Sequence, residues 1–492
     1  MIPCALQKVT ERSCRAPMNT EQNTVSATKL PAEFCEQIIA LVGVDKWRTD
    51  SQSIESHGRD STHFYKAAAA AIVFPKSIDQ IQQIVLLANQ HNISLVPSGG
   101  RTGLSGGAMA TNGELVVSFD YMNEISDFDP INQTVVCQPG VVTQQLQEFA
   151  EQNDLYYPVD FASAGSSQIG GNIATNAGGI KVIRYGMTRD WIKGLKVVTG
   201  KGELLDLNKG LTKNATGYDL RHLFIGSEGT LGLIAEATIQ LTRTPKDSPV
   251  LVLGVDSFGA ILNVLEAFQQ NLQISAFEFF SEQALQKVLA RHSLQRPFEA
   301  GPNYYCLIEF EAVSEQTTEQ AMQTFETCVE SGWVINGVMS QNQTQAKNLW
   351  RLREDISESI SHFTPYKNDI SVTVSQMPTF IKKVDQLVAQ QYPDFEIIWF
   401  GHIGDGNLHL NILKPEALDT EQFTQRCGEV SPKVFEFVEE LGGSISAEHG
   451  VGLLKKDYLH FSRSEEEIFA MKAIKAVFDP NGIMNPGKLF DV

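Results

Sequence analysis

The sequence predicts an α+β fold of two or three domains, and three observations carry this prediction. A chain of 492 residues is longer than one domain usually is. Three glycine-rich segments lie between residues 97 and 232, interleaved with apolar, strand-like runs. After residue 246 the glycine density falls, and strands alternate with helices as in an α+β domain whose antiparallel sheet is covered on one face. We predict domains at residues 30–245, 246–440 and 441–492, after a leader at residues 1–29.

The leader is polar and is expected to be disordered. Its first 17 residues carry basic side chains but no apolar run, so they are not a secretory signal peptide. A weak organelle-targeting segment and a dispensable extension before Met18 both stay open. Residues 30–44 then have the apolar spacing of a helix.

A β-α-β unit leads into the first glycine-rich segment. Residues 70–74 and 93–96 predict buried strands, and Ser77 with Gln80 forms a capping pattern that starts the helix between them. The second strand runs into P-S-G-G-R-T-G-L-S-G-G at residues 97–107. Because glycine lets backbone N–H groups approach an anion, the segment predicts a ligand site, with a flexible surface loop as the alternative. The pattern is not G-x-G-x-x-G, which argues against a Rossmann nucleotide site.

Two further glycine-rich segments follow, at residues 164–179 and 214–232. Strands are expected between the three segments, at residues 115–119, 134–137 and 195–199. Together the segments predict one extended ligand held by backbone contacts, and a dinucleotide cofactor fits this arrangement better than a single phosphate does.

Two histidines lie in the hairpin W-F-G-H-I-G-D-G-N-L-H-L-N-I-L-K, at residues 399–414 of the second domain. Asp-Gly at its centre suits a two-residue type I′ turn, which would pair His402 with His409. Cross-strand partners lie close together on one face, and Asn411 follows on the same face. The two imidazoles could therefore share a metal ion, with a surface hairpin as the alternative.

A second cluster, A-E-H-G-V-G at residues 447–452, adds Glu448 and His449. Two histidines and a carboxylate with an open position form the ligand set of catalytic zinc and of other divalent metals.

Composition narrows the function classes. The net charge of −19 argues against nucleic acid and anionic membranes as partners. No stretch reaches the roughly 18 apolar residues that a membrane-spanning helix needs. Seven scattered cysteines without metal-type spacing favour reduced thiols and a cytoplasmic location.

Six motifs, in this order, carry a family resemblance. They are P-S-G-G-R-T-G-L-S-G-G, G-G-N-I-A-T-N-A-G-G, G-S-E-G-T-L-G, G-H-I-G-D-G-N-L-H-L-N, A-E-H-G-V-G and F-D-P-N-G-I-M-N-P-G-K. From residue 45 to residue 490 the chain resembles the FAD-linked oxidases of the vanillyl-alcohol oxidase/p-cresol methylhydroxylase type, and most closely their D-2-hydroxy acid dehydrogenases, those acting on D-2-hydroxyglutarate in particular. The resemblance implies a bipartite FAD-binding domain, which the C-terminal segment completes, with an α+β substrate domain in between.

The resemblance also assigns the FAD contacts. They fall on Ser98, Gly99, Gly100, Arg101, Thr102, Gly103, Leu104 and Gly106 for the pyrophosphate; on Ser163, Ala164, Gly165, Gly170, Gly171, Asn172, Ala174 and Thr175 along the pyrophosphate and flavin; on Ile234 near the adenine; and on Asn485 at the isoalloxazine. Relatives with covalent flavin carry a histidine where this chain has Arg101, so FAD is expected to bind noncovalently.

His402, His409 and Glu448 match the family's metal ligands, and Asn411 and His449 match its catalytic residues. Three further positions match the residues that bind the substrate carboxylates: Arg353, Lys367, and Ser357 in place of a threonine. A helix at residues 349–360 would put Arg353 and Ser357 on one face. A solvated helix face, with Arg353 paired to Glu354 or Glu358, is the alternative.

The implied reaction is oxidation of a D-2-hydroxy acid, D-2-hydroxyglutarate before others, to its 2-oxo acid. A divalent metal would bind the hydroxyl and one carboxylate oxygen, His449 would take the proton, and flavin N5 would take the hydride. Zinc is favoured, with manganese, iron and cobalt open. Electrons would pass to a carrier protein or quinone, and a homodimer is possible. The alternatives are a D-lactate or glycolate dehydrogenase, an oxidase using oxygen, a non-redox transferase like the ether-lipid synthases, and a metal-binding or glycine-rich interaction protein without catalysis.

Overall fold

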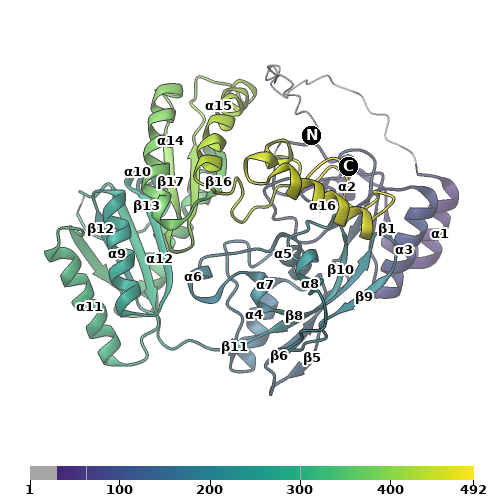
Figure 1. Ribbon diagram of the computed structural model, residues 1–492, viewed down its shortest axis with the longest axis horizontal. Helices are drawn as coiled ribbons and strands as arrows, with labels where there is room; N and C mark the ends of the chain where they lie inside the picture. The colour runs from purple at the N-terminus through teal and green to yellow at the C-terminus, as the bar shows by residue number, and fades with distance from the viewer. Residues whose placement is uncertain (1–29, 63, 300) are drawn as a thin grey trace, which may run out of the picture.

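The computed structural model describes residues 30–62, 64–299 and 301–492. The predicted leader at residues 1–29 lies outside the described residues. In Figure 1 the strands of the first domain lie on the right and those of the second on the left. The C-terminal helix α16 (Glu465–Phe478) returns to the first domain, where the Phe478 ring lies 4.9 Å from the Phe224 ring.

The first domain begins with a four-stranded sheet in the order β1-β2-β4-β3. Its strands are β1 (Trp47–Arg48), β2 (Ala71–Val73), β4 (Leu115–Ser118) and β3 (Leu95–Ser98), the last three parallel. Helix α3 (Ile78–His91) connects β2 to β3, and the Ser77 hydroxyl accepts the backbone N–H of Gln80, as the capping pattern predicts. Helix α1 (Ala32–Val42) packs on the same core through Phe34 and Ile38. These elements confirm the predicted β-α-β unit.

A second, five-stranded sheet in the order β5-β6-β10-β8-β9 completes the scaffold of the first domain. Its strands are β5 (Ile125–Asp129), β6 (Thr134–Cys137), β10 (Gly232–Gln240), β8 (Ile192–Thr199) and β9 (Leu204–Leu207), all antiparallel. The helices beside it are α4 (Thr143–Gln152), α5 (Ile169–Thr175), α6 (Val182–Tyr185), α7 (Thr188–Trp191) and α8 (Arg221–Phe224). The glycine-rich segments connect these strands and helices, so both sheets hold them in place.

The C-terminal segment returns to the edge of the first sheet. The backbone N–H of Leu95 donates to Ile483 O at 2.7 Å, and the N–H of Asn485 donates to Leu95 O at 2.8 Å. The buried Lys475 ammonium fixes the turn before them, because it donates to Asp479 at 2.7 Å and to the carbonyls of Thr230 and Met484 at 2.8 and 2.9 Å. Residues separated by almost 400 positions therefore form one sheet edge.

The second domain is built on a seven-stranded antiparallel sheet, in the order β15-β12-β14-β13-β17-β18-β16. Its strands are β15 (Asn336–Met339), β12 (Val250–Val255), β14 (Tyr304–Phe310), β13 (Ile274–Ser281), β17 (Ile397–His402), β18 (Asn407–Ile412) and β16 (Tyr366–Ser371). The predicted antiparallel sheet is confirmed.

Helices cover both faces of this sheet, so the predicted one-sided cover is wrong. Helices α9 (Phe258–Asn271), α11 (Glu315–Glu330), α14 (Met377–Gln391) and α15 (Thr420–Glu440) pack on one face, and α10 (Glu282–Arg291), α12 (Gln343–Glu354) and α13 (Ile356–Ile360) pack on the other. The reason lies in strands such as β12, which is buried at every residue and is an unbroken apolar run, as strands covered on both faces are.

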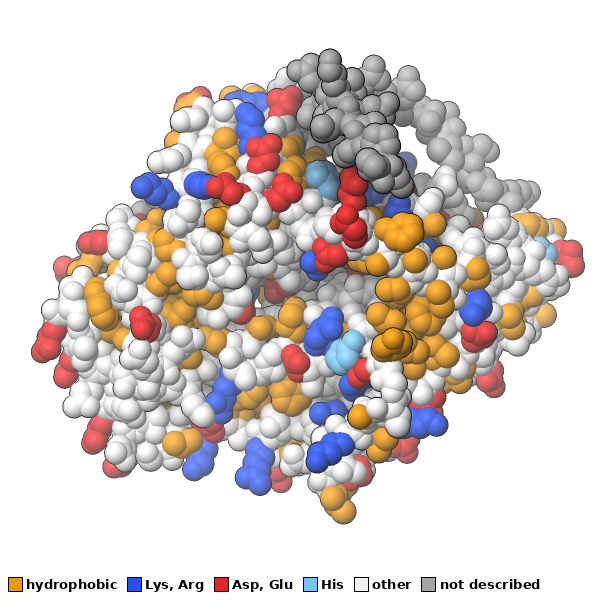
Figure 2. All heavy atoms as spheres, viewed as in Figure 1, with side chains coloured by type: hydrophobic (Ala, Val, Ile, Leu, Met, Phe, Trp, Pro, Cys, Tyr) orange, Lys and Arg blue, Asp and Glu red, His pale blue; other side chains and the backbone are white. Residues whose placement is uncertain are grey.

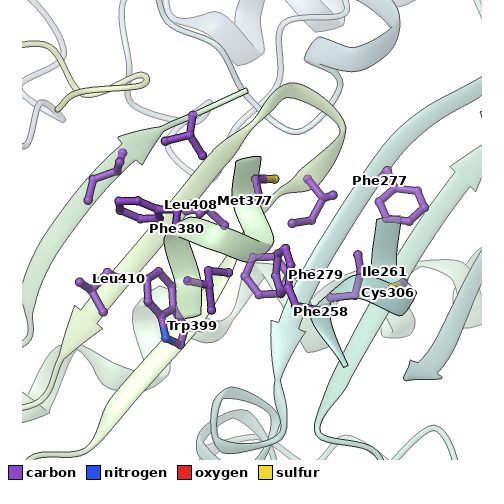
Figure 3. Packing of buried hydrophobic residues seen from close by; sticks show 14 of the residues in the cluster. Phe258, Ile261, Phe277, Phe279, Cys306, Met377, Phe380, Trp399, Leu408 and Leu410 are labelled. Atoms are coloured by element: carbon purple, nitrogen blue, oxygen red, sulfur yellow. The ribbon is translucent and has the colours of Figure 1, made fainter. Parts of the chain in front are cut away.

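Figure 3 shows how the core of the first face is filled. Phe258 and Ile261 of α9 lie near Phe277 and Phe279 of β13, while Met377 and Phe380 of α14 lie against the hairpin residues Trp399, Leu408 and Leu410. This packing holds β17 and β18 from one side, and their opposite face carries apolar side chains, such as Phe400, beside polar ones.

The surface carries charged side chains of both signs. Acidic and basic side chains are interspersed over the face drawn in Figure 2. Within the described part of the chain, no helix is long and apolar enough to cross a membrane.

Candidate active site

The histidine hairpin differs from its predicted register. A 3-10 turn over Ile403–Asp405 and Gly406 connects β17 to β18, so the loop has four residues rather than two. A type I′ turn needs positive φ at both central residues, but only Gly406 has it, at +87°. A Cβ at Gly406 would lie 2.3 Å from the Val372 carbonyl oxygen, which explains the glycine. His402 therefore pairs with Asn407, and His409 pairs with Phe400.

Although the predicted register is wrong, each side chain of the two strands lies on the predicted face. The register is displaced by two residues, and an even displacement leaves each side chain on the face where it was predicted. His402 and His409 are both buried, and their ring centroids lie 5.3 Å apart. Asn411 is buried on the same face, opposite Ile398.

Three imidazoles surround one carboxylate oxygen of Glu448. Its Oε1 lies 3.9 Å from Nε2 of His402, 3.6 Å from Nε2 of His409 and 3.8 Å from Nε2 of His449. The loop after α15 thus brings Glu448 and His449 to the face of the hairpin, as their matching motifs imply.

Two buried carboxylates lie behind the imidazoles. Nδ1 of His402 donates to Glu278 at 2.8 Å. Asp369 lies 3.9 Å from Nδ1 of His409 and 3.7 Å from Nδ1 of His449, and it accepts the backbone N–H groups of Glu448 and His449 at 3.0 and 2.9 Å. These contacts turn each Nε2 atom toward Glu448.

The electrostatics follow from this arrangement. Burial alone would lower the pKa of His402, but Glu278, and to a smaller extent Glu448, outweigh it and raise the pKa to about 9. Burial and the neighbouring His402 lower the pKa of His409. Burial would raise the pKa of Asp369, yet His449, Lys455 and His409 hold it well below its usual range.

The donor set fits a divalent metal ion. Asp369, His409, Glu448 and His449 offer ligand atoms within 4.8 Å of one another, and His402 reaches the same Glu448 oxygen. Imidazole nitrogen and carboxylate oxygen are the ligands of zinc and of neighbouring transition metals. Carboxylates behind the imidazoles, as Glu278 and Asp369 are here, typically orient metal-bound histidines.

A cavity between the two sheets of the first domain meets this cluster, because His449 lines both. The predicted FAD residues on the cavity wall are Gly99, Gly100, Arg101, Thr102, Gly103, Gly170, Gly171, Asn172, Ala174, Thr175 and Ile234. The other predicted FAD residues are absent from the wall formed by the described residues: Ser98, Leu104, Gly106, Ser163, Ala164, Gly165 and Asn485. Two of these buttress the fold, since Ser98 Oγ donates to His57 O at 2.9 Å and Asn485 Nδ2 donates to Gly107 O at the same distance.

The wall fits an extended cofactor. Eight of its lining residues are glycines, which leave backbone groups accessible: Gly99, Gly100, Gly103, Gly107, Gly170, Gly171, Gly229 and Gly232. At Gly100 a Cβ would lie 2.3 Å from the Ser166 carbonyl oxygen, so the close contact between the two loops requires glycine. The buried Gln168 Oε1 on this wall has no hydrogen-bond partner among the described residues, which leaves an acceptor for a ligand donor.

Arg353 is buried with 5 % exposure, and its Nη2 lies 2.9 Å from Glu278. The predicted continuous helix is wrong: Asp355, with ψ near 0°, ends α12 and begins α13, so Arg353 and Ser357 belong to different helices. Neither Glu354 nor Glu358 pairs with Arg353 in the described residues.

Lys367 lies on β16 opposite Asn411 and is exposed. Among the described residues no carboxylate lies within 4.0 Å of its ammonium. Ser357 is half-buried on α13.

The family follows from comparison with known proteins. The family described as FAD linked oxidases, C-terminal domain, matches residues 244–489, and the FAD binding domain family matches residues 69–208. A D-2-hydroxyglutarate dehydrogenase of Stutzerimonas stutzeri (strain A1501) is 63% identical, over 92% of this chain and 98% of the relative. The chain belongs to the FAD-linked oxidases. It is an FAD-dependent enzyme of their D-2-hydroxy acid dehydrogenase group.

A second relative supports the same family placement, and a solved structure shows the same fold. A D-2-hydroxyglutarate dehydrogenase of Xanthomonas citri pv. viticola is 51% identical, over 90% of this chain and 94% of the relative. The solved structure of p-cresol methylhydroxylase with substrate bound is 16% identical, with a TM-score of 0.73 over 93% of this chain and 96% of that one. The predicted α+β, bipartite fold is confirmed.

Sequence reasoning about this FAD-linked oxidase missed three acidic residues. Glu228, within G-S-E-G-T-L-G, lines the cavity and accepts the backbone N–H groups of Val451 and Gly452 at 2.7 and 2.8 Å, while burial raises its pKa to about 7. Glu278 and Asp369 are acidic residues at buried positions of strands. The sequence signal for the two strand residues is an acidic residue at a buried strand position, but this signal does not show which residue it pairs with.

Proposed function

We propose that this FAD-linked oxidase oxidises D-2-hydroxyglutarate to its 2-oxo acid. One observation carries the proposal: His449 borders both the glycine-lined cavity and the imidazole–carboxylate cluster. A hydroxy acid between them would have a proton acceptor and a redox cofactor within reach. The two bacterial relatives named D-2-hydroxyglutarate dehydrogenase support the choice of substrate.

Two groups absent from the chain complete the proposal. FAD, bound noncovalently in the glycine-lined cavity, would accept the C2 hydride. A divalent metal, zinc in our choice, would be held by His402, His409 and Glu448 and would act as a Lewis acid toward the hydroxyl.

The chain's own residues then have separate roles. His449 takes the hydroxyl proton at Nε2, because its Nδ1 faces the Asp369 carboxylate and its ring is fixed by that contact. Asn411, buried on the same face, adds a neutral hydrogen bond. Arg353 and Lys367 bind the substrate carboxylates, and Ser357 adds a hydroxyl.

The cationic residues favour a dicarboxylate. Nε and Nη2 of Arg353 are buried donors without hydrogen-bond partners among the described residues, although Nη2 lies in ion-pair range of Glu278. A second substrate carboxylate would satisfy the Nε donor, whereas lactate would leave it unpaired. Unpaired buried polar groups cost ~1–3 kcal/mol, so we expect at least ~10-fold discrimination in kcat/KM.

The test compares kcat/KM for D-2-hydroxyglutarate and D-lactate in the wild type and in Lys367→Met. In the variant, kcat/KM for D-2-hydroxyglutarate should fall, so that its ratio to kcat/KM for D-lactate becomes smaller. Equal values for the two acids in the wild type would end the proposal in favour of a lactate or glycolate dehydrogenase. Flavin that neither acid reduces would favour a non-redox transferase.

The electron acceptor in this proposal is a carrier protein or a quinone. Anaerobic reduction followed by exposure to oxygen tests this, because an oxidase would reoxidise rapidly. We also propose a reducing, cytoplasmic compartment, in line with the five described cysteines, which are free thiols.

A further inference from the structure

Glu278 is an acidic residue with 1 % exposure in the middle of the seven-stranded sheet. Its strand, β13, reads I-S-A-F-E-F-F-S and is buried at every position. The register places Glu278 directly opposite His402 of β17. Burying a carboxylate is costly unless it is paired, so its partners indicate why it is there.

The two oxygens of Glu278 contact two different parts of the candidate site. Oε1 accepts from Nδ1 of His402 at 2.8 Å, and Oε2 lies 2.9 Å from Nη2 of Arg353. His402 is a proposed metal ligand, and Arg353 is a proposed ligand of the substrate carboxylate. One buried carboxylate therefore bridges the two binding functions.

A second contact connects the same groups. The Arg353 guanidinium carbon lies 4.6 Å from the centre of the Phe400 ring, in the geometry of a cation–π contact. The Phe400 ring in turn lies 4.9 Å from the ring of His409, its partner in the strand register. Arg353 is thus fixed against both histidines, through Glu278 to one and through Phe400 to the other.

We propose that Glu278 is a positioning residue that couples metal binding at His402 to carboxylate binding at Arg353. It fixes the His402 tautomer with Nε2 toward Glu448, and it holds the guanidinium while leaving Nε free to donate. The inference rests on the proposed function, because that function makes Arg353 a ligand of the substrate carboxylate. The coupling of Arg353 to the metal site through Glu278 does not depend on which acid is oxidised.

Glu278→Gln tests the first half of the inference. The glutamine oxygen can accept from only one of the two donors, and its amide N–H would face the other. We expect the zinc dissociation constant, measured by chelator competition, to rise at least ~10-fold, as is usual when the partner of a metal-bound histidine is lost. FAD absorbance should stay at the wild-type level, because Glu278 lies outside the glycine-lined cavity wall formed by the described residues.

Glu309→Gln is the matched control. Glu309 lies on the neighbouring strand β14, is also buried, and is held by Ser275, Trp350 and Lys181 rather than by residues of the site. Its substitution should leave the zinc constant unchanged. An equal rise in both variants would show a general effect on the sheet and would overturn the inference.

Arg353→Met tests the second half and leaves Glu278 in place, should the first variant fail to fold. Arg353 is not a proposed metal ligand, yet we expect a change of about fivefold or more in the zinc constant. In the Glu278→Gln background, Arg353→Met should change the zinc dissociation constant less than about twofold. Additive effects, or a wild type that binds no zinc, would overturn the coupling, whereas equal kcat/KM for the two acids would overturn only the substrate.

Discussion

Glu228→Ala should loosen the loop that carries Glu448 and His449. Glu228 belongs to the first domain, and its carboxylate accepts the backbone N–H groups of Val451 and Gly452, immediately after the two site residues. A second bond, from Ser105 Oγ to the His449 carbonyl at 2.9 Å, holds the same loop. The substitution removes the first anchor and leaves the second, together with the bonds from the backbone of Glu448 and His449 to Asp369.

The expected size follows from the contacts. The 2.7 and 2.8 Å hydrogen bonds are short, and each buried N–H left without a partner costs ~1–3 kcal/mol. Burial raises the pKa of Glu228 to about 7, which shows that part of this gain is offset by desolvation. At the low end of this range, the two N–H groups together make local opening of the loop easier by about 2 kcal/mol, or roughly 30-fold.

Hydrogen exchange of peptides covering residues 446–455 measures this opening directly. With FAD in excess, exchange in Glu228→Ala should be roughly 30-fold faster, and turnover should fall because His449 is held less firmly. The control is Glu236→Ala, which removes a carboxylate of β10 that pairs with Lys196 at 2.7 Å. Wild-type exchange of these amides in Glu228→Ala would refute the reasoning.

Four further predictions address the cofactor, the metal, the proton acceptor and pH. Acid precipitation should release intact FAD into the supernatant, as its absorbance would show, whereas flavin that stays with the polypeptide would contradict noncovalent binding. His402→Ala and His409→Ala should each lose the metal and nearly all turnover but keep FAD, and full metal content in either would refute the ligand assignment. His449→Ala should keep the metal and turn over at least ~10²-fold more slowly, so near-normal turnover would exclude it as the base. Because the folded protein holds the Glu228 proton more tightly than the unfolded chain does, stability present below pH 4.5 should be lost as pH rises to about 7, and Glu228→Gln should flatten this loss in denaturant unfolding at pH 5 and pH 8.

The histidine hairpin shows both the reach and the limit of sequence reasoning. Alternation along a strand fixes which side chains share a face, so His402, His409 and Asn411 were grouped correctly. The turn was wrong because Asp405-Gly406 is compatible with a type I′ turn and also with a four-residue loop, and tertiary contact at Val372 decides between them. Because the strand register is displaced by two residues, the histidines still share a face; a displacement of one residue would have placed them on opposite faces.

The missed carboxylates show a different limit. Glu278 lies 124 positions from His402 and Glu228 lies 223 positions from Val451, so no local pattern connects them. Their partners are fixed only when strands from distant parts of the chain align. Arg353 was assigned through the family resemblance, but its buried pairing with Glu278 could not be predicted from α12 alone.

The return of residues 483–485 to β3 has a consequence for biosynthesis. Asn485 donates to the carbonyl oxygens of Gly107 and Glu228, both of which lie on the cavity wall. The wall that would hold the flavin is therefore unsupported while the chain is still on the ribosome and these residues remain in the exit tunnel. We expect FAD to load only after residue 485 has left the exit tunnel, so that a nascent chain stalled with this residue still inside would carry no flavin.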